Sequence, residues 1–184
     1  HGKVTADWAT YFTMNDQSDR GWIFRRGTTN VASISSGGAA SFLAVGTDKY
    51  IAYPQGGQYK YSDGGITGAI RITLPVRNTS TMLHFTVTIY NYEAGTSSTY
   101  YIAGYNYNGG GWYHCSAYSL RQRHDSKGNL TVRFADDGSK AYIYIGETNT
   151  SWSYPNIVVS NVLLGHSSQS FATWATGWAV DIVT

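Results

Sequence analysis

Apolar and polar residues alternate along most of the chain from about residue 47 onward, which is the pattern of half-buried β-strands. The clearest example spans residues 82–92, where Leu83, Phe85, Val87 and Ile89 would face one side of a sheet. No segment stands out with the period of an amphipathic helix, so the pattern predicts an all-β chain. Further strand-like runs occupy residues 69–74, 98–107, 112–120, 129–147, 156–165 and 177–184.

Turn signals between these runs predict two hairpins. Asp136, Asp137 and Gly138 separate two alternating segments within residues 129–147, and an Asp–Gly sequence favours a tight turn. The stretch 104–114, GYNYNGGGWYH, places three consecutive glycines between two other strand-like runs. Glycine adopts positive φ without strain, so the segment Asn108–Gly111 is predicted to turn the second hairpin.

The first part of the chain has a different texture. Two short apolar pairs, Trp22 with Phe24 and Ala32 with Ile34, are separated by polar and glycine-rich connectors, and no run there is apolar enough to build a core. We therefore expect a short β-rich segment over residues 1–46 that must pack on a neighbour or on other copies of itself. Residues 47–184 are expected to form the globular domain.

Composition supports an all-β class. Charged residues make up 13% of the chain, about half the usual share of roughly 25%, whereas aromatic residues reach 15%. The 16 tyrosines and the frequent Thr, Val and Ile suit pleated, half-buried surfaces. With regular turn signals, this composition favours an antiparallel, jelly-roll-like β-sandwich for the globular domain.

Charge and cysteine content exclude several classes of function. The net charge is only +2 and no long basic run is present, which argues against nucleic acid or an anionic membrane as a partner. No apolar stretch approaches the ~18 residues of a membrane span. The single cysteine, Cys115, rules out an intramolecular disulfide, and the histidines lack the spacing of a metal site. We expect no metal and no cofactor.

Few residues are candidates for catalysis. Asp136 and Asp137 are interpreted as turn residues, because Asp favours local backbone hydrogen bonds there. His114 and Cys115 would point to opposite faces of a strand, and Cys115 is expected to be a small buried residue. The stretch 104–114 lacks the lysine, the helix and the glycine spacing of a phosphate loop. No catalytic residue is predicted, although two isolated carboxylates could still meet in space.

Aromatic residues beside Asn, Ser or Gly in the expected loops are the candidates for ligand binding. Aromatic rings can stack on the apolar faces of sugar rings, and Asn, Ser and Tyr can hydrogen-bond to hydroxyl groups. Any one of these rings could equally pair across a sheet or contribute to a protein interface. The candidate glycan contacts are Tyr92, Tyr105, Tyr107, Asn108, Trp112, Tyr113, Trp152, Tyr154 and Trp174.

Two segments carry a resemblance to bacteriophage tail fibres. Residues 21–42, GWIFRRGTTNVASISSGGAASF, resemble the repeats that end tail-fibre shafts, with a Trp-x-Phe-Arg element followed by Asn-Val-Ala-Ser-Ile. Residues 131–166 and the closing TGWAVDIV are similar to a C-terminal module of tail fibre proteins. Neither segment is a catalytic signature, and no motif here allows receptor residues to be carried over from that family.

The resemblance implies a homotrimer in which three copies bury Trp22, Phe24, Ile34 and Phe42 along a shared axis. It also implies a location in the virion, at the distal end of the tail fibre, where a globular tip binds host cell-surface polysaccharide such as lipopolysaccharide or capsule. The prediction is thus a non-enzymatic receptor-binding tip. The alternatives are a tailspike-type enzyme that cleaves polysaccharide, a secreted single-chain lectin, and a purely structural domain that trimerises the fibre.

Overall fold

The computed structural model describes residues 20–35, 40–42, 44–47, 49–92, 96–121, 130–166 and 171–184. The chain divides into two compact units, His1–Leu43 and Ala44–Thr184. The predicted boundary after residue 46 falls inside strand β4 (Val45–Thr47), which pairs with β5 (Tyr50–Tyr53) in the second unit. Among the described residues, no helix is long and apolar enough to cross a membrane.

The first unit is a three-stranded antiparallel sheet in the order β1 (Gly21–Arg26), β2 (Thr29–Ser35) and β3 (Ala40–Phe42). Directly opposed residues share a face of such a sheet. Trp22 pairs with Ile34, Phe24 pairs with Ala32, and Ala32 pairs with Phe42, so these five apolar side chains lie on one face. None of the described side chains in this unit is buried, and Phe24 and Phe42 are 55% and 56% exposed.

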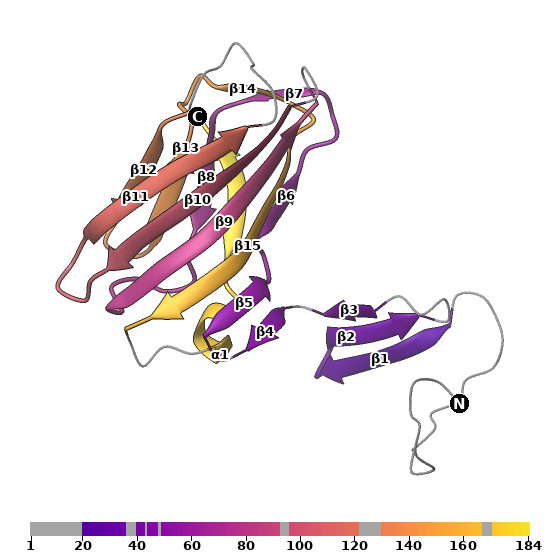
Figure 1. Ribbon diagram of the computed structural model, residues 1–184. Coiled ribbons are helices and arrows are strands. Elements are labelled where there is room, and N and C mark those ends of the chain that lie inside the picture. The colour runs from indigo at the N-terminus through magenta and orange to yellow at the C-terminus, as the bar shows by residue number, and fades with distance from the viewer. Residues whose placement is uncertain are drawn as a thin grey trace. The chain divides into compact units, whose positions relative to one another are not determined.

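The second unit is built from antiparallel sheets, which confirms the all-β prediction (Figure 1). The larger sheet has seven strands in the order β11-β10-β9-β15-β5-β4, with β6 paired to β15. A four-stranded sheet has the order β12-β13-β8-β16, and β14 pairs with β7. The remaining bounds are β6 (Gln58–Lys60), β7 (Gly65–Thr67), β8 (Ala69–Thr73), β9 (Thr81–Asn91), β10 (Thr96–Asn106), β11 (Trp112–Arg121), β12 (Val132–Asp136), β13 (Ala141–Ile145), β14 (Ser151–Ser153), β15 (Asn156–Gly165) and β16 (Ala179–Val183).

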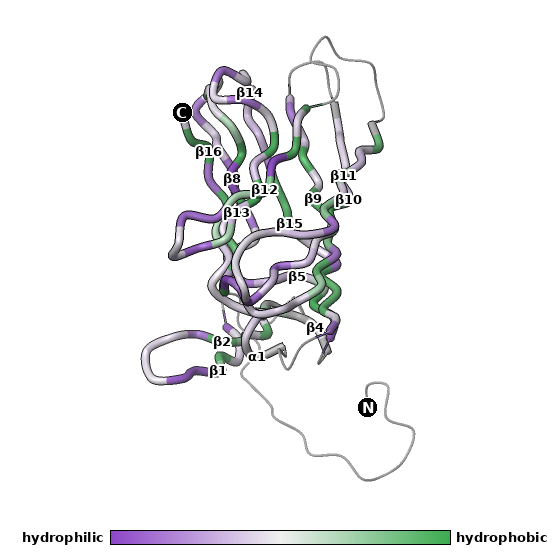
Figure 2. Tube along the Cα trace, turned by 90° about the vertical axis from the view of Figure 1, so that its left-hand side faces the viewer, coloured by the Kyte–Doolittle hydropathy of each residue, from purple (hydrophilic) through white to green (hydrophobic). Residues whose placement is uncertain are grey.

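The core lies between the seven-stranded and four-stranded sheets. Figure 2 shows β8, β13 and β16 on one side and β9, β10 and β11 on the other. Leu83, Phe85, Val87 and Ile89 are at most 3% exposed, which confirms the alternation predicted for this strand. Opposing side chains come from the four-stranded sheet, and both sets belong to one continuous apolar cluster that includes Ile70, Ile72, Ala141, Ile143 and Ile145.

Both predicted hairpins are present. Strands β12 and β13 are joined by a turn at residues 137–140, and β10 and β11 are joined by one at residues 107–111. A short helical turn, α1 (Phe171–Trp174), was not expected from the pattern. It is too short to carry a helical period, and it brings Trp174 into the core beside Trp178, whose indole N–H donates to the Trp174 carbonyl at 2.6 Å.

Candidate binding site

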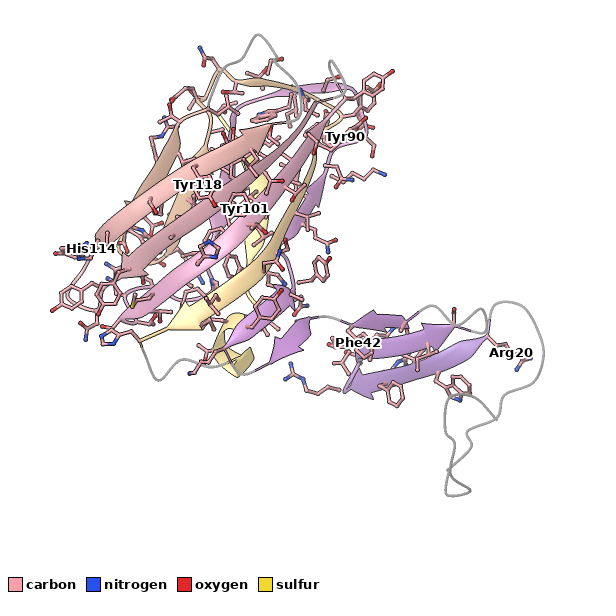
Figure 3. The ribbon with its side chains drawn as sticks, viewed as in Figure 1. Arg20, Phe42, Tyr90, Tyr101, His114 and Tyr118 are labelled. Carbon is pink, nitrogen blue, oxygen red and sulfur yellow. The ribbon has the colours of Figure 1, made fainter. Side chains whose placement is uncertain are left out.

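The outer face formed by β9, β10, β11 and β15 is almost free of charge. Arg121, at the end of β11, is the one Asp, Glu, Lys or Arg in β9, β10, β11 and β15. Tyr101 and Tyr118 lie opposite each other on this face and stack at 4.7 Å between ring centroids (Figure 3). Exposed rings without nearby charges are typical of surfaces that bind another molecule.

Three tyrosines gather at one end of this face, where the β10–β11 hairpin turns. Tyr105 lies opposite Met82 of β9 and Tyr113 of β11. The ring of Tyr107 is 5.9 Å from that of Tyr105 and 5.5 Å from that of Tyr113, measured between centroids. The ring of His166, which follows β15, lies 5.8 Å from Tyr105.

A shallow pocket of about 380 Å³ lies within this cluster. Its lining is mostly apolar, and two imidazoles, from His114 and His166, supply most of its polar character. We call Met82, Tyr105, Tyr107, Tyr113, His114 and His166 the hairpin-tip site. The volume is in the range of small-molecule pockets, roughly 300–1,000 Å³.

A β-bulge positions His114 in the hairpin-tip site. The register of β10 with β11 shifts between Ala103 and Tyr105, so His114 and Cys115 together oppose Gly104. His114 has φ of +51° and lines the pocket, whereas a Cβ at Gly104 would lie 3.3 Å from the Cys115 sulfur on the inner side. The two side chains therefore point to opposite faces, as predicted. Cys115 is exposed, so the expectation that it is buried was wrong.

The turn at residues 107–111 is closed by its own backbone. The Tyr107 N–H donates to the Gly111 carbonyl at 3.2 Å, and the Gly110 N–H donates to the Tyr107 carbonyl at 3.1 Å. Gly110 and Gly111 have φ of +98° and +92°, as the turn prediction required. Asn108 is exposed, and its backbone N–H donates to Ser80 Oγ at 3.4 Å. It is not among the residues that line the pocket.

Three predicted contact residues belong to the protein interior instead. Trp152 and Trp174 are 3% and 0% exposed, and the Trp152 indole N–H donates to the Gly68 carbonyl at 2.8 Å. Trp112 points inward from β11, packs against Phe134 at 5.2 Å, and donates to the Ala135 carbonyl at 3.0 Å. Trp152 and Trp174 are enclosed and cannot stack on a ligand, so they leave the candidate set. Trp112 is only partly buried, but it does not line the pocket beside Tyr105.

Tyr92 and Tyr154 form a separate pair at the other end of β9. Their rings meet edge to face at 5.6 Å, and they are 64% and 48% exposed. Tyr90 and His114 mark the two ends of the outer face in Figure 3. The eleven residues of β9 span roughly 35 Å, so Tyr92 and Tyr154 cannot share one pocket with the hairpin-tip site.

The described carboxylates are mostly bound to other groups of the protein. Asp136 accepts from Arg77 Nε at 2.7 Å, Glu147 is paired with Arg133, and Asp181 is paired with Arg71. Hydrogen bonds from Tyr142 and from the Lys140 and Ser139 backbone lower the pKa of Asp137 to about 2. A glycosidase acid needs a raised pKa, and these contacts have the opposite effect. No cluster of three metal-ligating side chains occurs in the described part of the chain.

Met82, His114 and His166 were missed by sequence reasoning. Met82 sits on the outer side of an alternating strand, which is a usable signal, but nothing in the sequence links it to His166. Only the pairing of β15 with β9, which places Gly165 opposite Met82, brings the two together. Comparisons with protein-family models, curated proteins and solved structures gave no match to this chain.

Proposed function

We propose that this chain is the receptor-binding tip of a bacteriophage tail fibre and that its hairpin-tip site binds a neutral cell-surface glycan. The observation that supports this best is an uncharged cluster of tyrosines, in which Tyr105 lines a pocket with two imidazoles and the rings of Tyr107 and Tyr113 lie beside it. The proposal includes a location in the virion and no catalytic step. Most of the described carboxylates are paired with arginines or accept hydrogen bonds within a turn of the protein itself.

The chemistry of the hairpin-tip site suits a sugar ring. Tyrosine rings offer flat apolar faces for the C–H face of a pyranose, and their hydroxyl groups remain available for hydrogen bonds. The ring nitrogens of His114 and His166 can form hydrogen bonds with sugar hydroxyl groups. A site without carboxylates or ammonium groups has no reason to favour a charged ligand, so a neutral, hydroxylated glycan is the best fit.

The proposed assembly is a homotrimer with a jelly-roll-like sandwich in each copy. The support comes from the first unit, where Trp22, Phe24, Ile34 and Phe42 share one face that the described residues leave partly exposed. A small sheet with such a face is marginal in water, and three copies can bury it jointly. Three tips on one fibre would then bind a polymeric glycan with higher avidity than one tip.

Sedimentation of the chain tests the assembly. We expect a particle three times the 20.2 kDa of one chain. Phe24→Asp places a charge on the apolar face and should dissociate the trimer. Ile23→Asp is the matched control, because Ile23 is 52% exposed and its partner Ser33 lies on the opposite face. A monomer in the unmodified protein would favour the secreted lectin instead.

A glycan array with the intact chain tests the binding site. Tyr107→Ala should weaken binding to the best glycan about tenfold, the effect of losing one ring contact. Tyr92→Ala removes a more exposed tyrosine at the far end and should leave binding unchanged. No binding to any glycan would favour the structural role, and release of shortened glycan from a bound polymer would favour the polysaccharide-cleaving enzyme.

A further inference from the structure

A second cleft opens at the edge where the two main sheets meet. β11 is the edge strand of the seven-stranded sheet and β12 is the edge strand of the four-stranded sheet. The inner face of β11 is incompletely covered there, since Ala117 lies opposite the fully buried Ile102 but is itself exposed. The resulting cleft has a volume of about 550 Å³ and is separate from the hairpin-tip site.

The two walls of this edge cleft differ in chemistry. Cys115 and Ser119 of β11 contribute small polar side chains to one wall, whereas Ser116 lies opposite Ala103 with its side chain on the outer face. Leu130, Val132 and Phe134 contribute the other wall, and all three pack against the core while remaining partly accessible. Phe134 is held in place by its edge-to-face contact with Trp112. No charged side chain is among the described residues that line this cleft.

Tyr100 supplies an unsatisfied hydrogen-bonding group at the base of the edge cleft. It is 2% exposed, it lines the cleft, and its hydroxyl has no hydrogen-bond partner among the described residues. Buried hydroxyl groups normally have a partner, because leaving one unpaired is costly. Phenylalanine would fill the same space without this cost, so the hydroxyl indicates a polar partner other than the described residues.

We infer that the edge cleft binds an uncharged sugar that carries an N-acetyl group. Such a group combines a methyl, which suits the wall of Leu130 and Val132, with an amide that can accept a hydrogen bond from the Tyr100 hydroxyl. The sugar hydroxyls would face Ser119 and the backbone of β11. The choice of a sugar rests on the proposed glycan-binding function, whereas the cleft and its unpaired hydroxyl are independent of it.

Cys115 provides a direct readout of the edge cleft. It is the one cysteine in the sequence, so a thiol reagent labels the protein at this position alone. Although Cys115 is exposed, partial desolvation by its neighbours raises the pKa of its thiol, which slows labelling and leaves room to measure protection. The experiment follows the labelling rate of the intact chain with increasing N-acetylglucosamine, and with glucose as the control that lacks the acetamido group.

N-acetylglucosamine should slow labelling in a saturable way, and glucose should not. Tyr100→Phe should weaken this protection about tenfold, the effect of one lost hydrogen bond, without lowering the melting temperature. Ala117→Leu should abolish protection by filling the cleft. Unchanged protection in Tyr100→Phe, or none in the unmodified protein, would overturn the inference.

The Tyr107→Ala variant separates this inference from the proposed function. Its hairpin-tip site is altered, but its edge cleft is intact, so protection of Cys115 should remain as in the unmodified protein. If Tyr107→Ala weakens binding on the glycan array while Cys115 is never protected, the edge-cleft inference is refuted and the proposed function stands. If Cys115 is protected and Tyr107→Ala binds glycans normally, the hairpin-tip site fails alone.

Discussion

Two hairpin turns of the second unit contain glycine, but they use their side chains in opposite ways. In the β12–β13 turn, Asp136 and Asp137 accept hydrogen bonds from the backbone of residues 138–140, from Arg77 and from Tyr142. In the β10–β11 turn, the backbone bonds close the loop without help from any carboxylate. The carboxylates of the β12–β13 turn are therefore occupied by hydrogen bonds within the protein, whereas the tyrosine rings beside the β10–β11 turn remain accessible.

One loop, at residues 75–80, contacts both turns and shows the same division. Arg77 binds Asp136 of the acidic turn through its guanidinium group. On the other side, the Asn78 backbone N–H donates to the buried Asn106 side chain, and Ser80 accepts from the Asn108 N–H. The β10–β11 turn, or glycine turn, is therefore held by hydrogen bonds from backbone N–H groups to the 75–80 loop and to Asn106. These bonds do not use its aromatic side chains, which are free to face a ligand.

The largest effect should come from removing the cation of the acidic turn. Arg77→Ala leaves the Asp136 carboxylate, whose side chain is only 15% exposed, without its cationic partner and with only the Gly138 N–H as a donor. We expect a loss of about 2 kcal/mol in the free energy of unfolding, measured by urea denaturation. Arg71→Ala is the control, because its pair with Asp181 is 34% and 41% exposed and should cost at most about 1 kcal/mol. Equal losses would contradict the view that burial makes Arg77 special.

The backbone strain of the two turns should be alike even though their side chains differ. Gly138 and Gly111 have φ of +88° and +92°, and a Cβ at either position would meet nothing within 4 Å. Gly138→Ala and Gly111→Ala should therefore each lower the free energy of unfolding by about 1 kcal/mol, which thermal or urea unfolding can compare directly. A much larger loss at one position would mean that this turn depends on more than its φ angle.

Gly109 lies against the ring of Tyr107, so a substitution at Gly109 should affect glycan binding more than stability. A Cβ at Gly109 would lie 2.4 Å from the Tyr107 ring and must displace it. We expect Gly109→Ala to weaken glycan binding about fivefold with a stability change under ~0.5 kcal/mol. Gly110→Ala is the converse control, because φ at Gly110 is +98° and an added Cβ would meet nothing within 4 Å. It should lower stability and spare binding.

The smallest effect should be the pH dependence contributed by Asp137. Its pKa in the folded protein is about 2, below the ordinary 3.8, so it contributes stability above 3.8 that is lost as pH falls through about 2. Asp137→Asn should have a slightly lower melting temperature than the unmodified protein near neutral pH. The difference should close between about pH 4 and pH 2, and a difference that persists at pH 2 would contradict this assignment.

The strands and turns could be predicted because they depend on neighbours in sequence. Alternation fixed which side of β9 is buried, and the glycine run fixed where the β10–β11 hairpin turns. Thr86 shows the limit of alternation. It lies on the outer side yet is 7% exposed, because its hydroxyl hydrogen-bonds to Ser160 on the neighbouring strand.

The candidate site could be predicted only in part. Tyr105, Tyr107 and Tyr113 are close in sequence, and the hairpin necessarily brings them together. Trp152 was expected in a loop, but it lies in the short strand β14, where pairing with β7 turns the indole inward. The edge cleft was not foreseen, because it depends on two sheets of unequal width meeting at β11 and β12.

The glycine turn also has a consequence for how this surface could diversify. Because residues 107–111 are closed by two backbone hydrogen bonds, and insertions at such loop tips are well tolerated, a longer or shorter turn need not disturb the paired strands behind it. The acidic turn has no such freedom, since a change of length would detach Arg77 and Tyr142 from their carboxylates. New ligand preferences can therefore arise by changing the length of one loop while the sheets keep their register.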